Sequence, residues 1–362
     1  MFRRSNKYFV GIEKSTECHK HAGSIRMKRN TTIDVIKGTV MFNVVICHAQ
    51  WTDTERLKLL FPFWVQMTIP TLMIISGYLY TKSFSKAQIH SLSQALIPSQ
   101  LIPKLIRFAV PYTMVYLVEV IAHIFLSPKG IMEILLMYLA GGWGPGTYYI
   151  PFMFQFVFFV PFVYLLIERK GARGLLVCWI STFVYEFLQK AYGMNVECYT
   201  FIVLRYAFHI AFGCYLALYS LDSLQKFLRI GMGVFGFCWI VILCYTSYEP
   251  LVFQPYWKNT AIFPSMFIVP VIGWLIEKTH LSCKPLELLG KASFNIYLTQ
   301  KIFYYGMETL FDGSFPFVHR TWVQCLINLM LCFAIGIIFY FIETPITKKL
   351  LQLIKQKKPV SA

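Results

Sequence analysis

Long apolar runs are the feature of this sequence that most restricts its fold. Segments of about 20 mostly apolar residues recur along the 362-residue chain, and a helix of that length crosses the ~30 Å hydrocarbon core of a bilayer. The chain is 57% hydrophobic and 14% charged, whereas a soluble domain carries about 25% charged residues. One soluble core is too small to bury so many apolar side chains, so the sequence predicts an integral membrane protein.

The spacing of the runs predicts an all-α, polytopic protein with about ten transmembrane helices in one bundle. The stretch Gly130–Ala140 is apolar but too short to span, so we expect it to form a re-entrant or surface loop with the glycine-rich Gly141–Gly146. The ten predicted helices lie near 33–51, 59–80, 108–127, 148–167, 174–190, 200–220, 230–248, 259–276, 292–311 and 322–342.

The formal net charge of +17 has a topological explanation. The basic residues lie in short segments between apolar runs, which is typical of cytoplasmic loops and does not suggest a nucleic-acid site. With ten crossings, about 25 Lys and Arg fall on the side of the two termini and roughly 6 on the other side. We therefore predict a multi-pass protein of the inner (cytoplasmic) cell membrane with both termini in the cytoplasm, the lipid bilayer as a partner, and no nucleic-acid partner.

The predicted domain organisation is a single membrane domain with a basic tail at each end. Residues 1–32 form a basic cytoplasmic tail in which Met27 is an alternative start, residues 33–346 form the transmembrane domain, and residues 347–362 form a basic C-terminal tail. No fixed-period repeat and no cleavable signal peptide are evident. The ten cysteines lack CxxC and metal-ligand spacing, so we expect reduced thiols and no metal.

The first predicted helix holds the most informative polar residues. Lys37 and His48 are eleven residues apart, which is about three helical turns and ~16 Å along one face. Asp34 precedes Lys37 by three residues and can pair with it. Two readings stay open. In one, this is a structural ion pair with an interfacial histidine, and in the other His48 is a general base that takes a proton from a hydroxyl attacking a carbonyl.

Two further groups of residues lie near the second and third predicted helices. Ser76 and Gly77 are small and permit close helix approach. Lys104 and Arg107 are three residues apart at a predicted helix entrance. They could clamp an anionic group such as the phosphates of coenzyme A, or they could be an ordinary positive-inside flank.

Other intramembrane polar residues have a structural interpretation beside the functional one. Glu119 and His123 share a face of the third predicted helix, and each such pair could join helices or line a site. Glu186 and the pairs Arg205/His209 and Lys301/Glu308 belong to the same class, and the aromatic residues Trp143, Tyr148 and Tyr149 fit an interfacial belt or a glycan platform.

Six motifs, in their order along residues 30–350, resemble those of the membrane-bound acyltransferase 3 family. The first resembles a family pattern usually written with Arg in place of Lys. The motifs are Lys37-x10-His48, Ser76-Gly77-Tyr78, Lys104-Leu-Ile-Arg107, Pro111-Tyr112, Leu289–Leu298 and Glu343-Thr-Pro345.

The resemblance implies a membrane O-acyltransferase that moves an acyl group, acetyl in the simplest form, from acyl-CoA to a hydroxyl of a surface carbohydrate or glycan precursor. It implies acetyl-CoA or another acyl-CoA as donor, a carbohydrate or polysaccharide acceptor, and glycan-synthesis machinery as a further partner. His48, Lys37 and Asp34 are then the candidate catalytic residues. The candidate donor-binding residues are Lys104, Arg107, Ser76 and Gly77, with Glu343, Glu119 and His123 as further site residues.

The sequence departs from the family pattern at three positions. Lys37 and Lys104 keep the charge of the usual Arg but lose its bidentate fork. Gln300 stands where the family commonly has a histidine. A polysaccharide exporter without acyl transfer stays open as the alternative function, and a sensory membrane protein is a third class.

Overall fold

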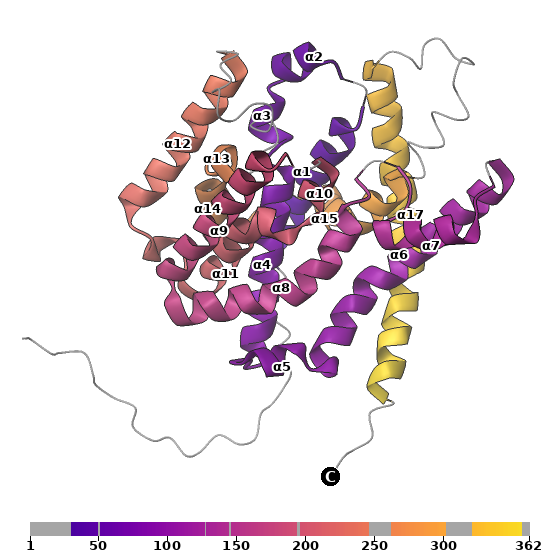
Figure 1. Cartoon of the computed structure of the whole chain (residues 1–362), viewed down its shortest axis with the longest axis horizontal. Coiled ribbons are helices and arrows are strands. Elements are labelled where there is room, and N and C mark those ends of the chain that lie inside the picture. The colour runs from indigo at the N-terminus through magenta and orange to yellow at the C-terminus, as the bar shows by residue number, and fades with distance from the viewer. Residues whose placement is uncertain are drawn as a thin grey trace, which may run out of the picture. The chain divides into compact units, whose positions relative to one another are not determined.

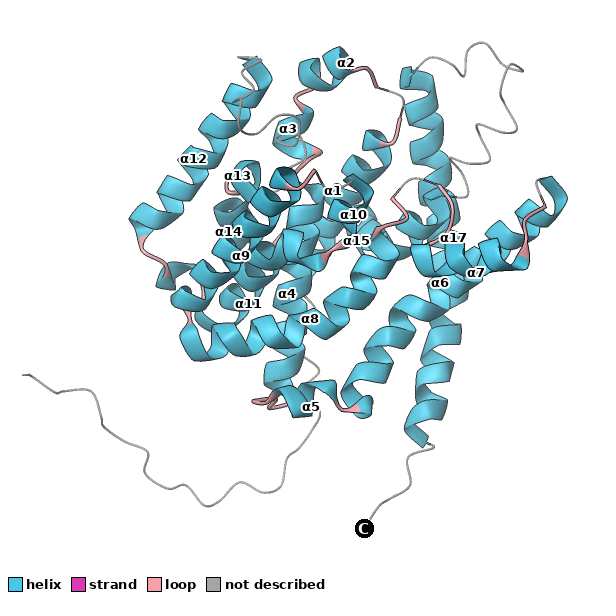
Figure 2. Cartoon of the chain, viewed as in Figure 1, coloured by secondary structure: helices cyan, strands magenta, loops and turns pink. Residues whose placement is uncertain are grey.

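The computed structural model describes residues 30–49, 51–126, 128–144, 146–193, 196–245, 262–301 and 321–356. Every regular element within these ranges is a helix, and they contain no strand (Figure 2). The all-α prediction is confirmed. Residues 1–29 of the N-terminal tail predicted at 1–32 lie outside the described residues.

The described helices run in chain order from α1 to α17, and Figure 1 labels the α-helices among them. Residues 293–301 form a further helix between α15 and α17. The helices from α1 to α17 are α1 (Thr31–Cys47), α2 (Asp53–Lys58), α3 (Phe61–Trp64), α4 (Thr68–Lys86), α5 (Leu92–Leu96), α6 (Pro98–Leu126), α7 (Ile131–Ala140), α8 (Tyr149–Lys170), α9 (Ala172–Ala191), α10 (Val196–Phe201), η1 (Val203–Tyr206), α11 (Ala207–Tyr219), η2 (Leu221–Ser223), α12 (Lys226–Tyr245), α13 (Ile262–Ser265), α14 (Ile268–Lys278), α15 (Lys284–Lys291) and α17 (Thr321–Gln356).

The predicted helix 59–80 is the clearest correction. Leu60 takes a left-handed conformation with φ 56° before α3, and Pro62 lies in the first turn of that short helix. Left-handed φ is costly for a residue with a Cβ, and at Leu60 it separates α3 from the preceding residues. Residues 65–67 then form a turn, which interrupts the predicted helix a second time. The long helix α4 begins only at Thr68, and Pro70 falls in its first turn, where the missing N–H costs little.

Three other boundaries also differ from the prediction. Helix α6 begins ten residues earlier than predicted and continues through Pro103 and Pro111. Helix α17 runs to Gln356, so much of the predicted tail 347–362 is helical. Residues 131–140, expected within a loop, form the short helix α7, which ends where Gly141 adopts φ 101°.

Three described helices are long and apolar enough to cross a membrane, namely Pro98–Phe125, Tyr149–Lys170 and Trp322–Ile354. The apolar helices Ile131–Ala140 and Val203–Tyr219 are shorter. The protein is thus a helical membrane protein, but helix length by itself does not confirm ten crossings.

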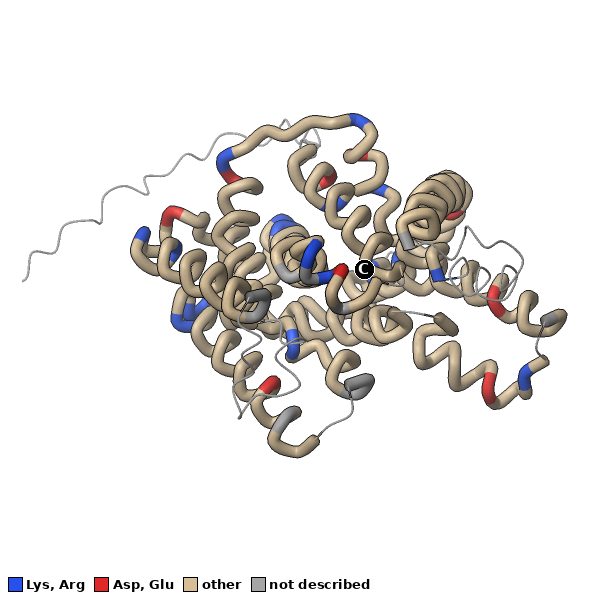
Figure 3. Tube along the Cα trace, turned by 90° about the horizontal axis from the view of Figure 1, so that it is seen from above, with Lys and Arg blue, Asp and Glu red and all other residues tan. Residues whose placement is uncertain are grey.

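The outer surface of two of these helices is apolar. In the most apolar stretch of α17 only 22% is buried, and in that of α6 only 33% is buried. Large apolar side chains on these helices are more than half exposed, and charged residues are sparse along the traced chain (Figure 3). Such a surface is suited to lipid and not to water. These side chains are Leu117, Ile121, Ile124, Met330, Ile338 and Phe341.

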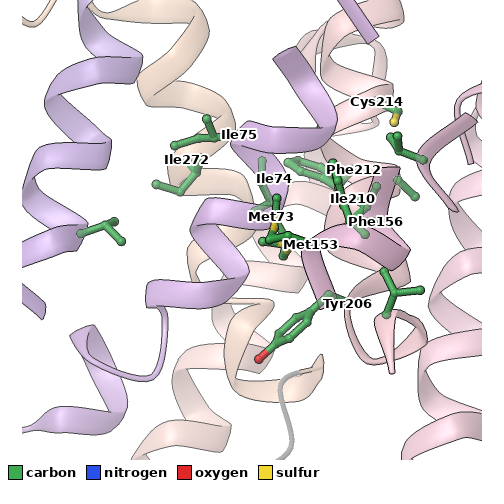
Figure 4. Close-up of a cluster of buried hydrophobic side chains, with 14 of the residues drawn as sticks. Met73, Ile74, Ile75, Met153, Phe156, Tyr206, Ile210, Phe212, Cys214 and Ile272 are labelled. Carbon is green, nitrogen blue, oxygen red and sulfur yellow. The ribbon is translucent and has the colours of Figure 1, made fainter. Parts of the chain in front are cut away.

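The interior is built around α4, α8 and α11. Side chains of these helices interlock in the cluster of Figure 4, and Met73, Ile74, Phe156, Ile210 and Phe212 have no exposed surface. In a membrane, close packing of this kind supplies much of the attraction between helices, since lipid is as apolar as the side chains themselves.

Two reciprocal glycine contacts bring helix backbones together. A Cβ at Gly77 of α4 would lie less than 3.0 Å from the carbonyl oxygen of Ile210 in α11, and one at Gly213 of α11 would meet Ile74 of α4 in the same way. Only glycine permits this approach, as in the small-residue contacts of membrane helices.

The second reciprocal contact joins α1 to α15. A Cβ at Gly38 would collide with the carbonyl oxygen of Leu286, and one at Gly290 would collide with that of Asp34. The backbones of α1 and α4, which carry most of the candidate site residues, are therefore held at fixed positions in the bundle.

We predict that Gly77→Leu destabilises the protein by about 3 kcal/mol or more, because the new side chain must force two backbones apart. The measurement is the thermal unfolding midpoint of detergent-purified protein. Gly231→Leu is the matched control, since a Cβ at Gly231 meets no atom within 4 Å. Equal loss of stability in the two variants would contradict the packing role of Gly77.

Candidate functional site

A cavity of about 280 Å³ lies between α1, α4, α6, α8 and the helix 293–301. Most of its wall is apolar or aromatic, with a few polar groups at intervals, which is the usual composition of a ligand site. The polar and aromatic lining residues are Lys37, Cys47, His48, Thr68, Ser76, Tyr80, Phe108, Tyr148, Tyr149, Ser293, Phe294 and Tyr297.

Lys37 and His48, which were predicted to share one face of the first helix, both line this cavity. The α1 residues Met41 and Val44 lie between them on the same wall, as helical periodicity requires. The two polar residues are separated by ~16 Å along the axis. The cavity thus extends along α1, with an ammonium group towards one end and an imidazole towards the other.

His48 follows the last residue of α1 and lies in a turn, where its backbone N–H donates to Val45 O at 3.3 Å. Beside it, Cys47 Sγ donates to Val44 O at 3.0 Å. The imidazole is therefore presented from the end of a rigid helix, in a position that is only partly exposed.

Asp34 lies elsewhere. Its side chain is buried, its backbone carbonyl faces Gly290 of α15, and it does not line the cavity. Its pairing with Lys37 stays a prediction.

The neighbours Ser76 and Gly77 are separated by the structure. Ser76 lines the cavity, whereas Gly77 packs against the backbone of α11 and does not. The motif therefore contributes one group to the cavity wall and one contact between helices.

Lys104 and Arg107 both lie beside Tyr80, which lines the cavity. Lys104 Nζ is 3.7 Å from the ring centroid of Phe84 and 5.2 Å from that of Tyr80, within the range of a cation–π interaction. Arg107 interacts electrostatically with the Tyr80 hydroxyl, and the next residue, Phe108, lines the cavity. The two basic residues thus adjoin the cavity from within α6. The prediction had placed them just before the start of this helix.

Glu119 and His123 hold the glycine-rich loop after α7. Glu119 accepts the backbone N–H of Trp143 at 3.3 Å, and the His123 ring lies 4.2 Å from the Trp143 ring. Tyr116 also stacks on this indole, with the ring centroids 5.3 Å apart and an interplanar angle of 5°. These contacts join α6 to the loop, and neither residue lines the cavity.

The helix 293–301 holds the same loop from a second direction. Lys301 Nζ donates to Gly141 O, and the Tyr297 hydroxyl donates to Gly146 O. Glu119 and Lys301 also attract each other electrostatically. Because Gly146 and Tyr297 line the cavity, these bonds fix part of its wall.

The glycines of this loop meet a backbone requirement. Gly141, Gly142, Gly144 and Gly146 have φ between 76° and 101°, a region that favours glycine over any residue with a Cβ. The expected loop therefore exists, shortened by α7, and is bonded to the bundle.

Glu343 supports the cavity indirectly. It accepts from Asn295 Nδ2 at 3.3 Å and from the Thr347 hydroxyl, and its side chain is buried. Asn295 lies between the lining residues Ser293 and Tyr297. Glu343 thus positions the helix that carries them and does not itself line the cavity.

Gln300 is fully buried, and both polar atoms of its amide lack a hydrogen-bond partner. It lies one turn beyond Tyr297 on the same helix, outside the cavity lining.

Sequence reasoning assigned Tyr148 and Tyr149 to a belt or platform and gave Tyr297 no role. The rings of Tyr149 and Tyr297 lie 4.8 Å apart on the cavity wall. Their convergence depends on a contact across about 150 residues, for which the sequence carries no local signal.

A family model described as an acyltransferase domain matches residues 30–350. No curated protein and no solved structure matches the chain. Across the described ranges, no group of three or more His, Cys, Asp and Glu side chains is arranged to hold a metal ion.

We predict that Lys301→Met loosens the loop that begins at Gly141. The variant loses a charged hydrogen bond to Gly141 O, which is worth about 1.5–3 kcal/mol. It also removes the positive charge that attracts the Glu119 carboxylate. Backbone amides of residues 141–144 should exchange with deuterium about tenfold faster or more, as measured by mass spectrometry. Lys291→Met is the control, because Lys291 Nζ lies 4.0 Å from Glu287 on α15, away from the loop. Unchanged exchange in Lys301→Met would contradict the clamp.

Proposed function

The chain belongs to the acyltransferase 3 family, and from this premise we propose that it is a membrane O-acyltransferase acting on carbohydrate. It moves an acyl group, acetyl in the simplest case, from acyl-CoA to a hydroxyl of a surface carbohydrate or glycan precursor. The observation that carries this proposal is the single cavity that Lys37 and His48 both line.

In the proposed reaction, His48 is the general base. Its neutral imidazole takes the proton of the acceptor hydroxyl as that oxygen bonds to the thioester carbonyl carbon. Collapse of the tetrahedral intermediate breaks the carbon–sulfur bond, and the imidazolium returns the proton to the departing thiolate. In the alternative course an imidazole nitrogen of His48 bonds to the thioester carbonyl carbon, the carbon–sulfur bond breaks, and the departing thiolate takes a proton from the imidazole. The acceptor oxygen then bonds to the acyl carbon and displaces the imidazole, which takes the hydroxyl proton. Lys37 provides a charge along the path, and Asp34, which does not line the cavity, is proposed to pair with it.

The donor is proposed to bind with its phosphates beside Lys104 and Arg107. These cations adjoin the cavity at Tyr80, and phosphate oxygens form strong charge-assisted hydrogen bonds with such groups. The pantetheine arm would follow the apolar wall along α1. The distance of ~16 Å between Lys37 and His48 is one that a long, slender arm can span, so that the thioester reaches the imidazole.

The proposed topology has ten crossings in the inner cell membrane, with both termini in the cytoplasm. It is supported by the excess of Lys and Arg in the segments on the side of the termini. The donor then reaches the cavity from the cytoplasm and the acceptor from the opposite side, where glycan-synthesis machinery would supply it.

His48→Ala should lower acyl transfer by about 10²–10⁴-fold, the usual contribution of a general base, while leaving the protein folded. The assay supplies membranes with radiolabelled acetyl-CoA and counts alkali-labile label in carbohydrate. His280→Ala, a change at an exposed position outside the cavity, is the control and should keep full activity. Equal activity in the two variants would remove His48 from the mechanism, and no transfer by the wild type would favour the exporter.

Arg107→Ala should raise the KM for acyl-CoA by about 10–100-fold, since a charged hydrogen bond to phosphate is worth about 1.5–3 kcal/mol. The KM for the acceptor should stay unchanged. Arg173→Ala, at an exposed site of α9, removes the same charge away from the cavity. The measurement is initial rate against donor concentration, and an unchanged donor KM in Arg107→Ala would contradict the phosphate site.

A further inference from the structure

A second cavity lies against a different face of α1. It has a volume of about 230 Å³, is open on one side, and is formed by α1, α3, α4 and α14 with Leu281. For comparison, apolar cavities of about 150 Å³ accept benzene. We call it the lateral groove. Its lining residues are Val35, Ile36, Thr39, Val40, Asn43, Phe63, Trp64, Met67, Thr68, Thr71, Ile268, Ile272, Leu275 and Leu281.

Most of the lining of the lateral groove is apolar, and two of its polar side chains are bonded to backbone carbonyls. Thr39 Oγ1 donates to Val35 O at 3.1 Å, and Asn43 Nδ2 donates to Trp64 O at 3.2 Å. These donors are therefore engaged with backbone carbonyls. A groove with such walls binds an alkyl chain and has little to offer a sugar or a phosphate.

Thr68 lines both the lateral groove and the cavity that contains His48. Its side chain is 5% exposed, and its Oγ1 has no hydrogen-bond partner. A buried hydroxyl without a partner costs about 1–3 kcal/mol. Its position between the two spaces suits a ligand that passes from one to the other and supplies the missing partner.

We propose that the lateral groove holds the hydrocarbon chain of a lipid-linked acceptor, and that the Thr68 hydroxyl binds its polar head group where the head group enters the catalytic cavity. This inference rests on the proposed function and names the substrate class. An acceptor dissolved in water would gain nothing from an apolar groove at the side of α1. A lipid-linked acceptor is already in the bilayer, so its hydrocarbon chain enters the groove by packing against apolar walls without crossing water.

The test uses photolabelling of the full chain in lipid nanodiscs. One probe carries a diazirine in a dodecyl chain attached to glucose, and the second carries the same chain on phosphocholine. Peptide mapping then locates the label. We expect the glucoside to label residues 61–72 and 268–281, and to do so at least about fivefold more than the phosphocholine probe at equal mole fraction.

Three variants test the site more closely. Ile272→Trp fills the lateral groove from a residue that is 3% exposed and should abolish this labelling. Ile338→Trp adds the same ring on α17, at a residue that is 59% exposed, and should leave labelling intact. Thr68→Val should raise the glucoside concentration needed for half-maximal labelling about fivefold without changing that of the phosphocholine probe.

The outcomes separate the alternatives. Equal labelling by the two probes would show a general lipid site and overturn the acceptor proposal, and absence of label from the lateral groove in the wild type would overturn it as well. Because the experiment contains no acyl donor, these results are distinct from a failure of acyl transfer, which would instead overturn the proposed function.

Discussion

Contact between helix backbones at glycine is the constraint on which the rest of this structure depends. Gly77 and Gly213 join α4 to α11, and Gly38 and Gly290 join α1 to α15. In a bilayer the hydrophobic effect does not drive helices together, so such contacts supply van der Waals attraction that larger side chains would prevent. These contacts hold α1 and α4, the two helices that supply much of the cavity wall.

The parts of the site that lie within one helix could be predicted from the sequence. Lys37 and His48 line one cavity because eleven residues are close to three turns of helix. The all-helical fold followed from the apolar runs for a similar reason, since a bilayer leaves few ways to satisfy backbone polar groups. Local periodicity was sufficient in both cases. It also gave the structural interpretation of Glu119 and His123, although not their partner Trp143.

The parts that depend on distant segments could not be predicted. The bond from Lys301 to Gly141 joins residues 160 apart in the chain, and Glu343 acts on the cavity through Asn295, 48 residues away. Neither contact has a signal in a short window of sequence. The start of α4 was missed because residues 65–67 form a turn inside an apolar run whose pattern favours a continuous helix. Local preference predicted a longer helix there, and tertiary structure overrode it.

His48 occupies the first position beyond α1, in the turn that follows Cys47. A side chain inside a helix is aimed by the helix axis, whereas one in a terminal turn is aimed by a few backbone dihedral angles. The direction of the imidazole is therefore set separately from the position of α1, which the backbone contacts at Gly38 and Gly290 hold. If His48 is the general base that we propose, a substitution in this turn would redirect the base without displacing the helix that carries Lys37.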